Sequence, residues 1–190
     1  MLTHNSNDCG LVDLTVRNEY DGYLGYDSPS DDNPVETEFE QEVPEHEIET
    51  TGTHFSLSPA VRVDLPESRK ALMEELGVGL HAVEHALISL LPREVLCDRG
   101  DVGGLLISHH PETELPTVFV YGGYPGGVGL VATAYEALGR LLDRTDDLID
   151  KCGCREGCPS YIHSPQCGNA NRYLDKSAGE CGLKPLHVAA

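Results

Sequence analysis

Residues 152–171, CGCREGCPSYIHSPQCGNAN, form the segment with the clearest chemical signal in this sequence. They hold four of the chain's seven cysteines, in the spacing C-x-C-x3-C-x8-C. Thiolates this close together can bind one tetrahedral Zn2+, and the glycines between them allow tight turns. The spacing therefore predicts a closed, structural zinc site formed by Cys152, Cys154, Cys158 and Cys167. An iron–sulfur cluster uses the same ligands, and free thiols in a C-terminal loop are the simpler alternative.

Two further segments precede the cysteines in a fixed order. They are HAVEHALISLLPREVLCDRGDVGG at 81–104 and PTVFVYGGYPGGVGLV at 116–131. Together with the cysteine segment at 152–176, they resemble the C-terminal zinc-binding region of MrfA-like DEAD/DEAH-box DNA helicases. The resemblance spans about residues 48–176. It implies a zinc-binding accessory domain that supports DNA repair, partnered by a helicase motor chain or domain and reaching DNA through that partner.

The cysteine pattern of this chain differs from that of the family at one position. The family pattern is C-x-C-x3-C-x2-C, whereas this chain has Tyr161 in place of the last cysteine. We therefore expect Cys167 to be the fourth zinc ligand, with His163 as the alternative.

The chain is strongly acidic, with a net charge of -19 over 190 residues. This charge argues against a simple basic nucleic-acid binder, because phosphate contacts need clustered lysines and arginines. A halophilic habitat is another explanation for such acidity. The bases around the cysteines run against the overall charge, and they are the possible DNA contacts: Lys151, Arg155, Arg172 and Lys176.

The sequence contains no secretory signal pattern and no apolar run approaching the roughly 18 residues that would span a membrane. We therefore expect a cytoplasmic protein with no membrane partner. Clustered thiolates fit a reducing compartment, and Cys9, Cys97 and Cys181 are expected to be free thiols. No Walker A segment is present, so we expect no motor activity from this chain and no catalytic residues.

The fold class that we expect is α+β, with two helices packed against a hairpin or small sheet and closed by the cysteine segment. Alternating apolar residues predict a strand at 11–17, with a turn at Asp21, and a second strand-like segment lies at 48–57. Prolines and acidic residues at 27–47 predict a flexible linker.

Three regions are predicted from these patterns. An acidic, β-like segment covers 1–58, the zinc-binding domain covers 59–176, and a loose tail covers 177–190.

Leucines at helical spacing predict a helix that starts after Pro66, hinges at Gly77 and Gly79, and stops at Pro92. Branched and aromatic residues at 102–108 and 117–121 predict a hairpin, with His109 and His110 solvated in its loop.

The glycine-rich segment GGYPGGVGL follows the second hairpin strand and predicts a strand-to-helix turn, with a phosphate cradle as the alternative. One long helix, with apolar positions from Leu130 to Ile149, should lead from this turn directly into Cys152.

His81, Glu84 and His85 share one helix face, because residues three and four apart are neighbours on a helix. They match the pattern H-x-x-E-H, in which two histidines bind zinc and the glutamate activates water. We expect these residues to pack structurally under the loop at 98–101. A zinc-dependent hydrolase is the alternative function, and a structural interaction domain unrelated to DNA is another.

Overall fold

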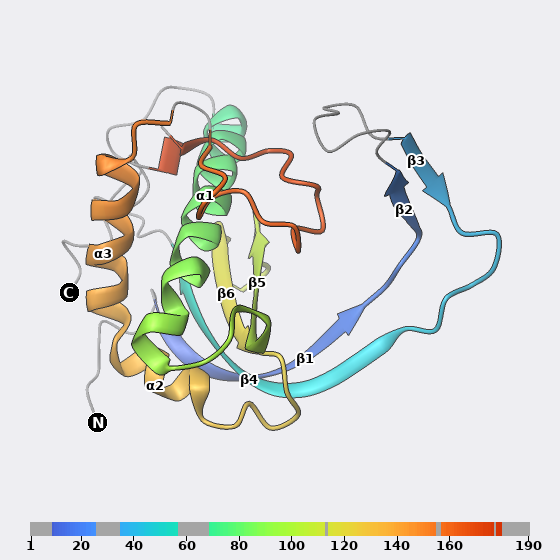
Figure 1. Cartoon of the computed structure of the whole chain (residues 1–190), viewed down its shortest axis with the longest axis horizontal. Coiled ribbons are helices and arrows are strands. Elements are labelled where there is room, and N and C mark those ends of the chain that lie inside the picture. The colour runs from blue at the N-terminus through green and yellow to red at the C-terminus, as the bar shows by residue number, and fades with distance from the viewer. Residues whose placement is uncertain are drawn as a thin grey trace.

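The computed structural model describes residues 9–25, 35–56, 69–112, 114–154, 157–176 and 178–179. Its strands are β1 (Cys9–Asn18), β2 (Gly22–Gly25), β3 (Val35–Glu38), β4 (His46–Ser56), β5 (Val102–Ile107) and β6 (Thr117–Gly122). Its helices are α1 (Arg69–Val95), the short 3-10 turn η2 (Arg99–Asp101), α2 (Leu130–Glu136) and α3 (Leu138–Lys151). The helices cover one face of a sheet (Figure 1), which confirms the predicted α+β class.

The main sheet is antiparallel, with the strand order β1-β4-β6-β5. Strands β5 and β6 form the predicted hairpin, in which Val102 lies opposite Gly122 and Ile107 opposite Thr117. Strand β4 joins this hairpin to β1, so strands from both sides of the boundary expected at residue 58 belong to one sheet. The acidic N-terminal segment therefore supplies half of the main sheet.

The segment expected to be a flexible linker contains a strand. Strand β3 pairs with β2 in an antiparallel ribbon that projects away from the main sheet (Figure 1). The rings of Tyr23 and Phe39 lie 6.0 Å apart at the base of this ribbon. The linker prediction was therefore wrong at 35–38 and at the start of β4, while 27–34 lies outside the described residues. The ribbon can form with few apolar contacts, because the pairing of β2 with β3 satisfies the hydrogen-bonding groups of the backbone.

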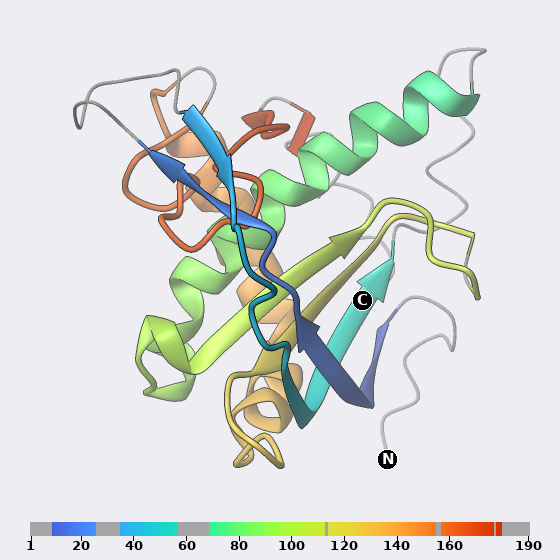
Figure 2. The same cartoon turned by 90° about the vertical axis from the view of Figure 1, so that its right-hand side faces the viewer.

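Helix α1 is longer than the sequence predicts, with 27 residues that continue through both glycines and three residues past Pro92. Pro92 removes only one backbone donor in the last turns, and burial of one helix face compensates for that loss. Gly79 is required for close packing, because an added Cβ would lie 2.5 Å from the backbone of Ala178. In Figure 2, α1 runs diagonally across the sheet. None of the described helices is long and apolar enough to cross a bilayer.

The single long helix predicted after the glycine-rich turn is divided into α2 and α3 at Ala137. Helix α3 packs against α1, and Glu94 of α1 forms ion pairs with Arg140 and Arg144 of α3. The core between helices and sheet consists of aliphatic side chains and one phenylalanine, including Phe55, Leu80, Leu87, Ile88, Leu91, Val118, Val120, Leu141 and Ile149. His110, which was expected to be solvated, is half-buried with its ring 5.4 Å from that of Phe119.

The glycine-rich segment forms the predicted strand-to-helix turn, and α2 begins at Leu130. The Gly126 amide donates to the Glu49 carbonyl at 2.9 Å, and the Thr50 hydroxyl donates to the Gly122 carbonyl at 2.9 Å. Gly127 has a φ of +67°, and a Cβ there would lie 2.9 Å from Thr51. The turn is thus bound to β4 by a backbone hydrogen bond, and the close approach of Gly127 to Thr51 requires glycine.

Candidate metal centre

Three of the four predicted cysteine ligands come together at the end of α3. The sulfurs of Cys152, Cys154 and Cys158 all lie within 4.8 Å of one another. Cys152 is the C-terminal cap of α3, so the helix fixes where the segment 152–158 begins. We call this segment the cysteine loop. Cys158 is buried with Ala82 of α1 and Ile162, in a small apolar cluster beside the main core. We call these three residues the cysteine cluster; three thiolates within reach of one ion form a donor set that fits zinc.

Tyr161 lies beside the cysteine cluster, at the sequence position where the resemblance leads one to expect a cysteine. Its hydroxyl is hydrogen-bonded to the thiols of Cys152 and Cys158. The hydrogen bond to Tyr161 lowers the pKa of the Cys152 thiol to about 7. The same interactions raise the pKa of Tyr161, because its phenol is held in the protonated form. The signal for this role was present in the sequence, since Tyr161 has the spacing of the missing ligand.

Lys176 braces the cysteine loop from inside the protein. Its ammonium group donates to the carbonyl of Cys152 at 2.6 Å and to that of Cys154 at 3.2 Å. The side chain is buried, with 5% of its surface exposed. Lys176 was expected to be a possible DNA contact, but in this arrangement its charge faces two backbone carbonyls and not the solvent.

The other predicted DNA contacts differ in their surroundings. Lys151 is exposed and forms an ion pair with Asp147 at 2.7 Å. Arg172 is also exposed, in the turns that follow the cysteine loop. Arg155 lies outside the described residues. Among the predicted contacts that the structure describes, Lys151 and Arg172 are the ones whose positions leave them accessible to a phosphate.

Cys167 does not join the cysteine cluster; it lies with two histidines of α1. Its sulfur is 3.6 Å from Nε2 of His81, and the donor atoms of Cys167, His81 and His85 all lie within 4.8 Å of one another. We call these three residues the histidine–cysteine cluster. His163, the alternative fourth ligand, is exposed and packs against Gly157. Neither proposed fourth ligand belongs to the group formed by the three cysteines.

Backbone carbonyls orient both histidines of α1. Nδ1 of His85 lies 2.5 Å from the carbonyl of Ile162, and Nδ1 of His81 lies 3.2 Å from the carbonyl of Tyr173. A carbonyl oxygen only accepts hydrogen bonds, so each ring carries a proton on Nδ1. In the neutral rings, each Nε2 then carries a lone pair that can accept a hydrogen bond or bind a metal ion. The loop that follows the cysteines therefore fixes the tautomer of both rings.

Glu84 lies between the two histidines, with Oε2 at 4.0 Å from His81 Nε2 and 3.7 Å from His85 Nε2. Burial raises the pKa of its carboxyl group to about 7, and the charges of His81 and Arg99 act in the opposite direction. Gly104 of β5 faces this carboxylate, and a Cβ at that position would overlap it.

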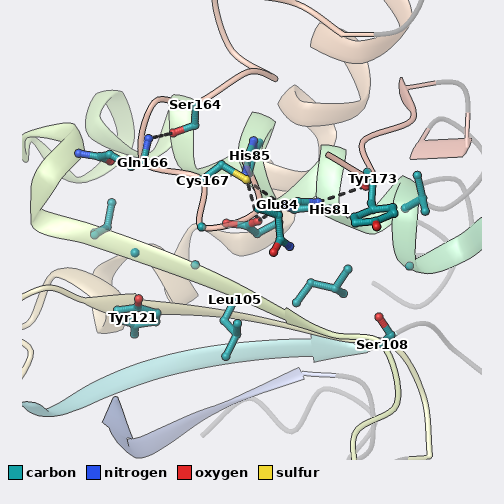
Figure 3. Close-up of a pocket in the computed structure, with 18 of the residues that line it drawn as sticks. His81, Glu84, His85, Leu105, Ser108, Tyr121, Ser164, Gln166, Cys167 and Tyr173 are labelled. Atoms are coloured by element: carbon teal, nitrogen blue, oxygen red, sulfur yellow. Dashed lines mark hydrogen bonds and ion pairs between the residues drawn. The ribbon is translucent and has the colours of Figure 1, made fainter. Parts of the chain in front are cut away.

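A cavity of about 900 Å3 opens beside these residues and is lined by α1, β5 and the turns around Cys167. Figure 3 shows His81, Glu84, His85 and Cys167 converging on one side of this cavity, with Leu105 and Tyr121 across from them. Arg99 of η2 also lines it. A structural role under the loop at 98–101 stays a prediction for the three α1 residues.

Sequence comparisons give a consistent set of relatives. The family model described as "MrfA Zn-binding domain" matches residues 83–160. The uncharacterized protein MJ1572.1 of Methanocaldococcus jannaschii is 33% identical over 100 residues, which is 51% of this chain and 89% of that protein. The uncharacterized ATP-dependent helicase YprA of Bacillus subtilis is 32% identical over 120 residues, or 63% of this chain and 15% of the helicase.

Solved structures of the DUF1998 helicase MrfA are similar to this chain. The DNA-bound form matches with a TM-score of 0.57 and 21% identity, covering 94% of this chain and 25% of MrfA. The form described without DNA matches with a TM-score of 0.51 and 26% identity, covering 88% of this chain and 20% of MrfA. The chain thus spans most of the archaeal relative and a quarter or less of each helicase. Since the matched residues run from α1 through the cysteine cluster, this chain belongs to the family of MrfA zinc-binding domains.

Proposed function

We propose that this chain is a zinc-binding accessory module of a DNA helicase, and that the motor is supplied by a partner chain or domain. The observation that carries the proposal is the family match at 83–160, which includes the three clustered cysteines. The similarity to YprA, whose name describes an ATP-dependent helicase, supports the same role. The printed sequence has no Walker A segment, so we expect no ATP hydrolysis by this chain.

The zinc ligands in this proposal are Cys152, Cys154 and Cys158, and the Tyr161 hydroxyl lies beside them at the sequence position of the family's fourth cysteine. Zinc would hold the cysteine loop closed, and the apolar contacts of Cys158 would hold that loop against α1. The metal thereby supplies a rigid surface at the end of α3. Thiolate ligation requires a reducing compartment, which is why we also propose a cytoplasmic location.

DNA is engaged mainly through the partner in this proposal, because a net charge of -19 opposes binding by the isolated chain. The exposed bases Lys151 and Arg172, together with Arg155, would add a local contact beside the cysteine loop. A role in DNA repair is part of the proposal, through the helicase that this module would support.

The test is reconstitution with a helicase motor from the same organism whose own zinc-binding region has been removed. We expect this chain to show no ATPase activity alone and to restore DNA unwinding when mixed with that motor. Unwinding that is equally fast without this chain would contradict an accessory role. ATP hydrolysis by the isolated chain would also contradict it.

A pair of charge reversals tests the DNA contact. Arg172→Glu should weaken DNA binding by the reconstituted complex while the zinc content stays unchanged. Arg17→Glu is the matched control, because Arg17 lies on β1, outside the cysteine loop, and pairs with Glu45 and Glu47. Equal effects of the two variants would mean that total charge, and not a local contact, controls binding.

A further inference from the structure

We propose that the histidine–cysteine cluster is a second metal site, which binds zinc through Nε2 of His81, Nε2 of His85 and Sγ of Cys167. This inference is independent of the helicase role, because it rests only on the placement of these three residues. It also differs from the ligand set expected from the sequence, in which Cys167 completes the shell of the cysteine cluster.

The distances between the donor atoms fit one ion. Zinc binds histidine nitrogen and cysteine sulfur at distances that place these atoms about 3.6 Å apart in a tetrahedral shell. The separation between His81 Nε2 and Cys167 Sγ is 3.6 Å. All three donor atoms lie within 4.8 Å of one another, so a single ion between them requires only small adjustments.

The orientation of the histidines supports metal binding more specifically than their proximity does. A histidine ligand usually donates its other ring N–H to a carbonyl or carboxylate, which fixes the tautomer. Both histidines do this, through Ile162 and Tyr173. Each Nε2 thereby keeps a lone pair for a metal: Nε2 of His81 lies 3.6 Å from the Cys167 sulfur, and both Nε2 atoms lie within 4.0 Å of Glu84 Oε2.

The cluster is also held rigidly by the fold. His81 and His85 are one helical turn apart on α1, and they are 8% and 5% exposed. Cys167 lies in a chain of turns, in which its amide donates to the Ser164 carbonyl and its own carbonyl accepts from Ala170. The three ligands of the proposed site therefore need little reorganisation when a metal ion binds, which favours metal binding.

The three protein donors leave one position of a tetrahedral shell available, and all three line the cavity of about 900 Å3. Three protein ligands with an open fourth position are the arrangement of zinc sites that bind a water or another small ligand, in contrast to closed structural sites. Glu84 is placed to accept a hydrogen bond from a water in that position. We therefore expect a small exogenous ligand such as imidazole to reach this ion.

Metal counting tests the proposal directly, using full-length protein purified without added metal. We expect about two zinc ions per chain, about one in Cys167→Ser and about one in Cys158→Ser, because each variant disrupts one shell. Cys97→Ser is the matched control and should keep both ions, since Cys97 lies in neither cluster. A single ion in the unmodified protein that Cys167→Ser retains would overturn the second site. A single ion that both variants lose would also overturn it, in favour of one shared shell.

X-ray absorption at the zinc edge tests the proposal on the unmodified protein, so the result does not depend on whether the variants fold. The two proposed sites have three thiolate ligands and one thiolate ligand, respectively. The average should therefore be about two sulfur ligands per zinc, with histidine scattering visible. An average of three or more sulfurs with no histidine contribution would overturn the proposal.

Discussion

The cysteine cluster and the histidine–cysteine cluster both contact α1 but are built in different ways. The first draws its three sulfurs from seven consecutive positions after α3. The second joins residues of α1 to Cys167, which is 86 positions further along the chain than His81. A local turn is enough to form the first cluster, whereas the second exists only when the C-terminal loop is docked on α1. Substitutions that affect one cluster and leave the other intact can separate the roles of the two clusters.

The largest effect is expected for Cys158→Ser, which removes a buried zinc ligand. We expect the free energy of unfolding to fall by more than about 4 kcal/mol, because the variant loses both the metal and the apolar contacts of the sulfur. Chemical denaturation of zinc-loaded protein measures this change. Cys97→Ser should differ little from the unmodified chain, and comparable losses in both would argue against a structural zinc at Cys158.

Lys176→Met should cost about 3 kcal/mol, because two carbonyls of the cysteine loop lose a charged donor while the apolar stem is kept. The loss should appear as weaker zinc retention by the cysteine cluster during titration with a chelator. Lys151→Met is the control, since it breaks an exposed ion pair worth less than about 1 kcal/mol. If the two variants behave alike, the buried lysine does not brace the loop.

Gly104→Ala should cost about 2 kcal/mol, because the new methyl group overlaps Glu84 and Ile88 of α1. The histidine–cysteine cluster lies on that side of α1, so its metal should be released more readily while the cysteine cluster is unaffected. Gly100→Ala meets no atom within 4 Å and serves as the control. Thermal unfolding and metal content of the two variants would show whether the strand supports the histidines.

The smallest effect is expected for Tyr161→Cys, which restores the cysteine pattern of the family. We expect about tenfold tighter zinc binding at the cysteine cluster, equivalent to about 1.4 kcal/mol, as a thiolate replaces the hydroxyl. Competition with a chromophoric chelator measures the affinity. Tyr161→Phe removes only the hydroxyl and should shift affinity in the opposite direction; an unchanged affinity in both variants would place Tyr161 outside the zinc shell.

The contrast between the clusters also explains how much could be predicted from the sequence. The hairpin of β5 and β6, helix α1 and the clustering of Cys152, Cys154 and Cys158 follow from local periodicity and spacing, which record local geometry. The position of Cys167 beside His81 and His85 depends on docking of the C-terminal loop on α1, so its spacing from Cys158 in the sequence could not indicate these neighbours. The same limit applies to Lys176, whose burial cannot be inferred from a run of nearby bases.

Tertiary contacts overrode local signals in the backbone as well. Pro92 is a strong helix terminator in isolation, yet α1 continues past it because the helix is fixed by its buried face. The acidic, proline-rich composition of 27–47 disfavours a core, but a two-stranded ribbon needs only pairing partners. Gly79 was expected to be a hinge, but it lies within α1 and permits close packing of the helix against the backbone of Ala178.

The glycine-rich turn has a consequence for one exposed edge of the sheet. Strand β4 pairs with β6 only from Gly52 to Ser56, so the earlier part of that strand would present an open edge. The amide of Gly126 and the backbone of Gly127 cover this edge at Glu49 and Thr51. Unpaired strand edges are templates for intermolecular β-pairing and aggregation. A bulky residue at Gly127 should uncover this part of β4 and expose it to pairing with another strand, so the turn shields β4 as well as leading into α2.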